Sequence, residues 1–146
     1  MPILILCLVV ILVDQFSKFY IQSTMNLGMS IPIIPHVFHI TYILNPGAAF
    51  GILENQRFFF ISIGVFILLA AIFFFPKLQK EKLPLKVGSA LLLGGAVGNL
   101  IDRIQTGYVV DFFDFRIWPI FNAADIAIVC GVGLIIYTIL FKGRMK

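Results

Sequence analysis

The strongest constraint on this chain is a run of eighteen residues, 58–75, that contains no charged side chain. A helix needs about 20 mostly apolar residues to cross the roughly 30 Å of hydrocarbon in a bilayer. Three further segments of similar length are also mostly apolar, at about residues 3–21, 85–104 and 120–141. The first of them is interrupted by Asp14 and Lys18. The sequence therefore predicts four membrane-spanning helices.

The composition agrees with an integral membrane protein, because 60% of the residues are hydrophobic and only 12% are charged. A soluble domain of this length would need more polar residues to cover its core. We expect an all-α membrane protein in which residues 1–146 form a single domain. No basic cluster is interleaved with aromatic residues, so a nucleic-acid partner is not expected.

The segment at about residues 25–57 lies between the first two predicted spans and has a different pattern. Residues 36–44 mix β-branched and aromatic side chains in the alternation of a short strand, and "NPG" at 45–47 ends it. We predict a small extracytoplasmic sheet there, with Trp118 as an interfacial anchor. His36 and His39 lack further ligands nearby, so we interpret them as polar surface residues of the strand and expect no metal.

The distribution of basic residues predicts how the spans are oriented. Lysines gather in the loop between the second and third spans (Lys77, Lys80, Lys82 and Lys86) and basic residues recur in the C-terminal tail (Lys142, Arg144 and Lys146). Cytoplasmic loops of membrane proteins carry such an excess of Lys and Arg. Both termini are therefore expected in the cytoplasm.

With this orientation, most acidic residues fall near the outer face. Six of the seven acids do so, namely Asp14, Glu54, Asp102, Asp111, Asp114 and Asp125. This one-sided placement indicates a polar site that opens outward. Cys7 and Cys130 lie within apolar runs and are predicted to be buried free thiols. The N-terminal run lacks a basic n-region and a small-residue cleavage site, so we expect it to be retained as a span.

Polar residues inside the spans need partners or a task, because a charge at mid-bilayer costs about 2.5–3.5 kcal/mol. Asp14 and Lys18 are four residues apart on a helix and can pair, for a structural or a substrate-contacting purpose. Asn99 and Arg103 share a face of the third span, and Asp102 could balance Arg103. Gly94 and Gly98 of the same span predict the close approach of another helix.

Asp111 and Asp125 are the candidates for chemistry, since the loop between them is long enough to bring their carboxyl groups together. Two carboxylates about 4 Å apart repel by about 4 kcal/mol at an effective dielectric constant of 20. One would then keep its proton while the other stays ionised, as in aspartic proteases. The ionised group can take a proton from water, and the protonated group can polarise a peptide carbonyl. Asp114 is interpreted as a solvated loop acid.

Other catalytic sequence motifs are absent from the sequence. It contains no H-E-x-x-H zinc motif and no G-x-S-x-G elbow. The residues alone leave two alternatives to a protease. One is a small proton-coupled transporter in which Asp14, Asp102 and Asp125 form a relay, although no inverted repeat is visible. The other is a non-catalytic chaperone or scaffold, whose clients would be lipoproteins according to the resemblance described next.

Five motifs follow one another along the chain, namely "DQFSK" at 14–18, "NPGAAFGIL" at 45–53, "GGAVGNLIDR" at 94–103, "VVDFFDF" at 109–115 and "FNAAD" at 121–125. In this combination and order the sequence resembles the signal peptidase II family of bacterial membrane aspartyl proteases. The resemblance covers nearly the whole chain. It implies four spans with an outer sheet that forms a cradle on the membrane surface, and a lid formed by the segment after the third span.

The resemblance also implies an activity and the roles of individual residues. Asp111 and Asp125 would be the catalytic pair, and Asn45, Asn99, Arg103 and Asn122 would position substrate or support the pair. Asp14, Lys18 and Asp102 would have structural or substrate-binding roles. The implied substrate is a prolipoprotein that is cleaved just before its diacylglyceryl-modified cysteine. We expect a monomer without cofactor in the bacterial cytoplasmic membrane, in contact with phospholipid and with its site near the outer face.

Overall fold

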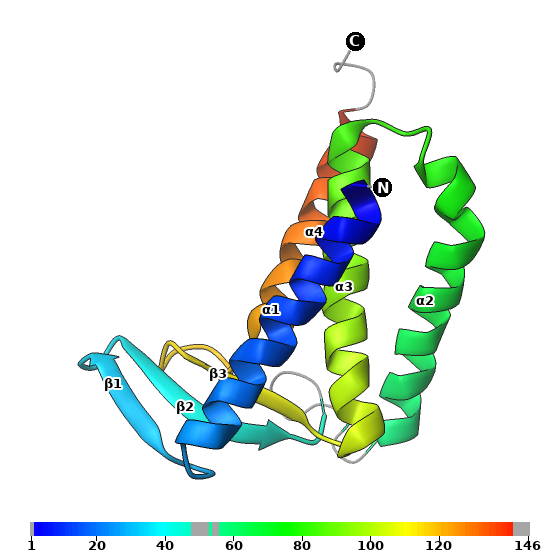
Figure 1. Cartoon of the computed structure of the whole chain (residues 1–146). Helices are drawn as coiled ribbons and strands as arrows, with labels where there is room; N and C mark the ends of the chain where they lie inside the picture. The colour runs from blue at the N-terminus through cyan, green and yellow to red at the C-terminus, as the bar shows by residue number, and fades with distance from the viewer. Residues whose placement is uncertain (1, 48–52, 54–55, 142–146) are drawn as a thin grey trace.

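The computed structural model describes residues 2–47, 53 and 56–141, which form four helices and one three-stranded sheet (Figure 1). The helices are α1 (Pro2–Thr24), α2 (Arg57–Leu78), α3 (Leu83–Gln105) and α4 (Ala123–Leu140). The strands are β1 (Ser30–Ile34), β2 (Phe38–Asn45) and β3 (Val109–Asp114). The sheet lies at one end of the helix bundle, beside the C-terminal end of α1 (Figure 1).

All four helices are long and apolar enough to cross a membrane, which confirms the predicted four-span layout. The fourth helix begins at Ala123 rather than at residue 120. Its start is fixed by a capping box, in which the Asn122 side chain accepts a hydrogen bond from the Asp125 N–H. Pro84 lies in the first turn of α3, where its missing N–H costs nothing.

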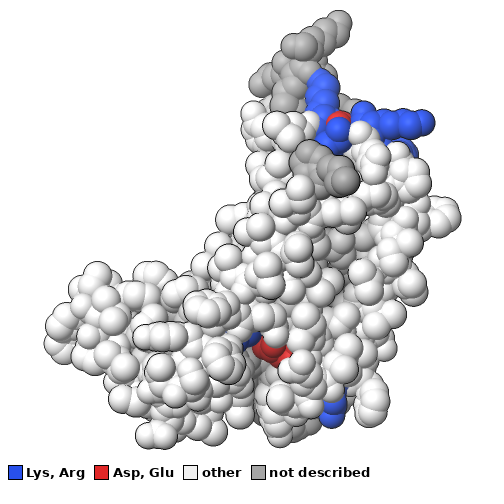
Figure 2. Space-filling model, viewed as in Figure 1, with Lys and Arg blue, Asp and Glu red and all other residues white. Residues whose placement is uncertain are grey.

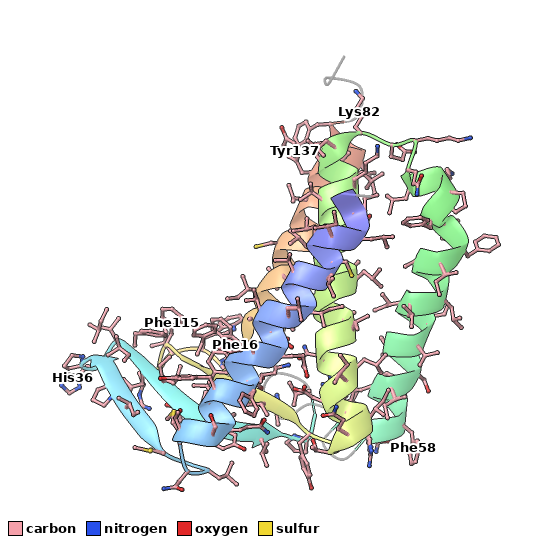
Figure 3. All side chains as sticks on the ribbon, viewed as in Figure 1. Phe16, His36, Phe58, Lys82, Phe115 and Tyr137 are labelled. Carbon is pink, nitrogen blue, oxygen red and sulfur yellow. The ribbon has the colours of Figure 1, made fainter. Side chains whose placement is uncertain are left out.

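The outer surface of the bundle is apolar, as a lipid-facing surface must be. Helix α2 has no buried residue, and its Phe58, Phe66 and Phe73 side chains project outward with exposures of 83%, 72% and 76%. Phe58 and Lys82 mark opposite ends of the molecule (Figure 3). On the face seen in Figure 2, basic side chains gather at the end that holds the α2–α3 loop, and an acidic patch lies recessed where helices and sheet meet.

The two cysteines differ from each other. Cys7 is buried as expected, but Cys130 is exposed, so the prediction that both are buried is wrong for Cys130. An apolar run in a membrane helix presents side chains to lipid as well as to the core, and the run alone does not distinguish the two faces. Glu54, predicted to face outward, and the basic residues of the tail, predicted to face the cytoplasm, lie outside the described residues.

The sheet is antiparallel with strand order β1-β2-β3. Strand β2 confirms the predicted strand at 36–44, with His36 in the preceding turn at a φ of 64°. Strand β3 was not predicted, because residues 109–114 were interpreted as a loop leading to a lid. The N–H groups of Phe112 and Phe113 both donate to the Phe121 carbonyl, which is a bulge that breaks the regular alternation of the strand.

Helix α3 lies at the centre of the bundle, and its glycines determine how closely the neighbouring helices approach. A Cβ at Gly94 would lie 2.7 Å from Val10 of α1, and one at Gly95 would lie 2.4 Å from the Ala124 carbonyl oxygen of α4. The prediction that Gly94 and Gly98 admit a close neighbour is therefore confirmed, and that neighbour is α1. This packing brings the C-terminal end of α3 beside the N-terminal end of α4.

Candidate active site

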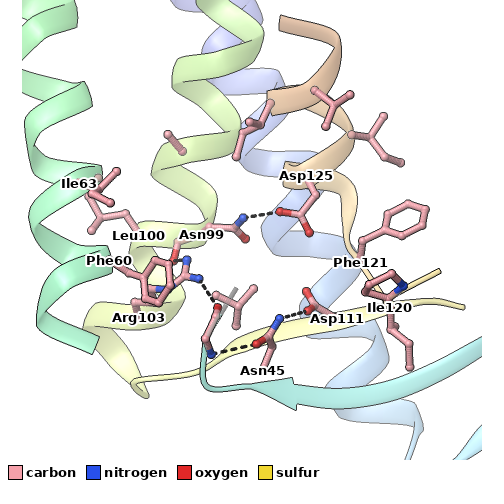
Figure 4. A pocket seen from close by; sticks show the side chains of 18 of the residues that line it. Asn45, Phe60, Ile63, Asn99, Leu100, Arg103, Asp111, Ile120, Phe121 and Asp125 are labelled. Atoms are coloured by element: carbon pink, nitrogen blue, oxygen red, sulfur yellow. Dashed lines mark hydrogen bonds between the residues drawn. The ribbon is translucent and has the colours of Figure 1, made fainter. Parts of the chain in front are cut away.

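A cavity of about 630 Å³ lies between α2, α3 and α4 at the end of the bundle that carries the sheet (Figure 4). Most of its lining is apolar and comes from α2, α4 and the segment that includes Trp118 and Phe121. Its polar lining includes five of the predicted site residues, namely Asn45, Asn99, Arg103, Asp111 and Asp125. The structure thus gathers side chains that are up to 80 residues apart in the sequence around one apolar chamber.

Asp111 enters this cavity from β3 and is 2% exposed. Its Oδ1 accepts a hydrogen bond from Asn122 Nδ2 at 2.7 Å, and its Oδ2 accepts one from Asn45 Nδ2 at 2.8 Å. Burial, followed by the negative charge of Asp125, raises the pKa of Asp111 to about 7, although both amide donors oppose this change. The pKa of this group is therefore matched to proton transfer near neutral pH.

Asp125 enters the same cavity from the first turn of α4. Its Oδ1 accepts a hydrogen bond from Asn99 Nδ2 at 2.8 Å, and its Oδ2 accepts one from the Asn122 backbone N–H at 3.2 Å. The position near a helix N-terminus favours a negative charge. Asp111 and Asp125 thus line one chamber and interact electrostatically, which is the juxtaposition that the loop length predicted.

Three asparagines bind the two aspartates, and each has its amide orientation fixed by a second contact. Asn45 Oδ1 accepts the Gly47 N–H at 2.9 Å, and Asn122 Oδ1 accepts the Asp125 N–H at 3.0 Å. Asn99 Oδ1 accepts from the Lys18 ammonium at 2.9 Å. These partners can only donate, so each asparagine must turn its NH₂ group toward a carboxyl group. The carboxyl groups therefore receive fixed donors rather than adaptable ones.

Arg103 forms the cavity wall opposite the aspartates. Its Nη2 donates to the Gly47 carbonyl at 3.0 Å, and its guanidinium lies 4.5 Å from the centre of the Phe60 ring (Figure 4). Asp102 does interact electrostatically with Arg103, as the sequence analysis suggested, but the salt bridge of Asp102 is to Lys18 at 2.8 Å. The sequence analysis paired Asp102 with Arg103 because the two are adjacent in the chain, whereas the cation bound to Asp102 in the structure is Lys18 of α1.

Behind the cavity wall, Asp14, Lys18 and Asp102 form a buried ion cluster. Lys18 Nζ lies 2.8 Å from a carboxylate oxygen of each aspartate. The predicted pairing of Asp14 with Lys18 is thus confirmed. Gln15, which the sequence analysis did not single out, donates to Asp14 Oδ2 at 3.2 Å and to Asp102 Oδ1 at 2.9 Å. The only feature of the sequence that could have indicated Gln15 is its position next to Asp14 in the first span.

Asp114 is a further correction, since it is 4% exposed rather than solvated. Burial disfavours its charge, but hydrogen bonds from Thr41 and Arg116 outweigh this effect and hold the pKa of Asp114 below its ordinary value. Its Oδ1 also accepts the Arg116 N–H at 2.8 Å, where Arg116 has a φ of 66°. Asp114 thus fixes the turn that follows β3.

The two histidines lie away from the cavity. His36 is at the tip of the sheet (Figure 3), and His39 Nδ1 lies 3.1 Å from Ser30 Oγ. Within residues 2–47, 53 and 56–141, no group of three His, Cys, Asp or Glu side chains is arranged to hold a metal ion.

The fold and the cavity define a multi-pass membrane protein with paired carboxyl groups at one end of its helix bundle. A family model described as signal peptidase (SPase) II matches residues 6–141. Lipoprotein signal peptidases of Moorella thermoacetica and Halothermothrix orenii are 46% and 48% identical over 96% and 90% of this chain, and over 93% and 90% of their own lengths. A solved bacterial membrane enzyme superposes with a TM-score of 0.91 at 41% identity, covering 99% of this chain and 92% of its own.

The chain belongs to the signal peptidase II family, and it is a multi-pass bacterial membrane protein and a protease. The alternative of a proton-coupled transporter is not favoured by this membership.

Proposed function

We propose that this protease cleaves the signal peptide of diacylglyceryl-modified prolipoproteins just before the lipidated cysteine, with Asp111 and Asp125 as the catalytic pair. The observation that carries the proposal is the presence of two carboxyl groups, each bound by fixed amide donors, in one largely apolar chamber. The relatives named lipoprotein signal peptidase support the substrate class. An apolar chamber between membrane helices suits a substrate whose signal segment and acyl chains stay in the bilayer.

The chemistry uses one proton shared by the pair. We assign the proton to Asp111, because burial and the negative charge of Asp125 raise the pKa of Asp111 to about 7, and we assign the role of base to Asp125. Asp125 takes a proton from water as the water oxygen bonds to the scissile carbonyl carbon, while Asp111 gives its proton to the carbonyl oxygen. Collapse of the resulting gem-diol breaks the C–N bond. Its hydroxyl proton returns to Asp111, and the proton on Asp125 passes to the leaving amine.

The other cavity residues position the substrate and the pair. The fixed amides of Asn45 and Asn99 orient the two carboxyl groups, and Asn122 contacts both segments that bear them. Arg103 Nη2 is held at the Gly47 carbonyl in the cavity lining, where the guanidinium can donate to a substrate carbonyl. Residues 118–121 line the chamber, which supports a role for this segment as a lid, and the exposed Trp118 side chain would act as an interfacial anchor.

The test is cleavage of a lipidated precursor by the purified protein and by its Asp111→Asn and Asp125→Asn variants. Each variant should lose at least about 10³-fold in kcat, because an amide can neither take nor give the shared proton. Glu81→Gln at the far end of the bundle is the matched control and should cleave normally. Near-normal turnover by either aspartate variant, in protein that inserts and folds, would overturn the assignment.

A further inference from the structure

The buried ion cluster makes contacts that connect it to both site aspartates. Lys18 Nζ bridges the carboxylates of Asp14 on α1 and Asp102 on α3, at 2.8 Å from each. Lys18 and Asp14 are 2% and 0% exposed, and Asp102 is 8% exposed. An ammonium between two carboxylates holds them at a fixed separation, because each would otherwise be an uncompensated buried charge.

Both bridged carboxylates also bind a backbone N–H next to a site aspartate. Asp14 Oδ1 accepts from the Ala124 N–H at 2.9 Å, and Ala124 precedes Asp125. Asp102 Oδ2 accepts from the Val110 N–H at 3.3 Å, and Val110 precedes Asp111. A continuous set of contacts therefore runs from one aspartate to the other through Lys18.

We propose that Lys18 is a positioning residue that sets the separation of the Asp111 and Asp125 carboxyl groups by bridging Asp14 and Asp102. The effect on cleavage rests on the proposed function, whereas the effect on the separation does not. Lys18 acts a second time through Asn99, whose orientation it fixes and whose NH₂ group binds Asp125. The Lys18 side chain thus controls both the separation of Asp111 and Asp125 and the orientation of the Asn99 amide that donates to Asp125.

The separation matters because the repulsion between two carboxylates determines how far apart their two protonation steps lie. Coulomb repulsion falls as the distance increases. A strongly coupled pair loses its protons in two steps separated by more than about one pH unit, and an uncoupled pair does not. If the pair moves apart, the range of pH in which it holds one proton becomes narrower.

The total charge around the pair must stay unchanged in a test. The neighbouring charged groups are Asp14 and Lys18 from α1 and Asp102 and Arg103 from α3, whereas the α2 side chains in the cavity lining (Phe60, Ile63 and Ile67) are apolar. The cluster of Asp14, Asp102 and Lys18 has two negative charges and one positive, a net charge of −1. A variant should remove the bridge without altering this total.

The double variant Lys18→Met/Asp14→Asn meets this requirement, because it removes one charge of each sign. We expect kcat on the lipidated precursor to fall about 100-fold, which is the effect of a displacement of about 1 Å in an active site. KM should stay within about 2-fold, because the double variant replaces none of the side chains that line the cavity. The bell-shaped profile of kcat against pH should narrow, so that its acidic and alkaline midpoints lie less than about one pH unit apart.

Val10→Ala is the matched control, since Val10 packs between the same two helices at Gly94 without a polar contact in the network. This change should lower the unfolding temperature and leave the width of the pH profile as it is in the unchanged protein. If that double variant fails to fold, Lys18→Met/Asp102→Asn removes the same bridge at the same net charge of −1 and tests the connection to β3 by the same measurements. A folded variant with an unchanged pH profile would overturn the proposal.

A readout independent of cleavage separates this proposal from the proposed function. Infrared titration of protein labelled with ¹³C-aspartate, with Asp111→Asn and Asp125→Asn to assign the bands, gives the two protonation midpoints directly. The midpoints should move closer together in Lys18→Met/Asp14→Asn. If they stay where they are, Lys18 does not set the separation, even if Asp111 and Asp125 prove to be catalytic. If the aspartate variants still cleave, the proposed function fails while the titration result stands.

Discussion

The amide of Asn45 donates to Asp111 Oδ2 at 2.8 Å, and this contact opposes the burial that raises the pKa of Asp111 to about 7. A hydrogen bond to a carboxylate stabilises the ionised form by about 1.5–3 kcal/mol. Asn45→Ala should therefore raise the pKa of Asp111 further, by about one pH unit. Because Asp111 loses its proton as the pH rises, the alkaline limb of the kcat/KM profile should move to higher pH.

The control for this prediction is Ser30→Ala, which alters the same sheet through Thr41 and His39 and does not touch Asp111. Its alkaline limb should coincide with that of the unchanged protein. An alkaline limb of Asn45→Ala that stayed in place, or moved to lower pH, would mean that Asp111 is not the group whose deprotonation ends activity.

At the residue scale, the sequence predicted five of the polar side chains that line the cavity, and the local pairing of Asp14 with Lys18. Helical spacing was enough for that pair, because residues four apart share a face. The sequence could not predict that Lys18 also binds Asp102 and orients Asn99, since both contacts depend on the register between α1 and α3. Asp114 was misread because its hydrogen bond from Thr41 depends on the pairing of β2 with β3, and its hydrogen bond from Arg116 depends on the turn after β3.

At the scale of whole elements, the contact between α3 and α4 positions the start of α4, where Asp125 lies. A Cβ at Gly95 would lie 2.4 Å from the Ala124 carbonyl oxygen, which belongs to backbone and cannot rotate away. Gly95→Ala should therefore push the first turn of α4 outward. We expect a loss of about 1–3 kcal/mol in the free energy of unfolding, despite the better helix propensity of alanine, together with a lower kcat.

Gly133→Ala on α4 provides the comparison, because no atom lies within 4 Å of a Cβ at that position. It should leave kcat unchanged and the unfolding temperature equal or slightly higher. Thermal unfolding and cleavage assays on the purified variants measure both quantities. Equal behaviour of the two glycine variants would mean that helix propensity, rather than the close approach of α3 and α4, governs this region.

The helices of this fold were predictable and strand β3 was not, for a physical reason. A span is encoded in about 20 consecutive residues, whereas a strand is stabilised by its partner. Strand β3 pairs with β2 and also bonds to Phe121 through a bulge, so its residues do not alternate regularly. Gly94 and Gly98 predicted that some helix approaches closely, but the choice of α1 depends on how the whole bundle packs.

At the scale of the whole molecule, the charges lie at two ends with an apolar zone between them (Figure 2). The last turn of α2 and the α2–α3 loop carry Lys77, Lys80 and Lys82, and the sheet with the cavity lies at the opposite end (Figures 1 and 3). Basic loops are retained in the cytoplasm because Lys and Arg resist translocation. The cavity should therefore open toward the outer leaflet, where the glyceryl group of the proposed substrate would lie.

This orientation can be measured with single cysteines placed at the two ends, after replacement of Cys7 and Cys130 by serine. His36 at the tip of the sheet and Lys80 in the α2–α3 loop are both exposed, so either position accepts a label. A membrane-impermeant maleimide should modify His36→Cys in spheroplasts and should reach Lys80→Cys only after the membrane is permeabilised. The reverse pattern would place the aspartates at the inner leaflet, where a precursor lipidated on the outer side could not reach them.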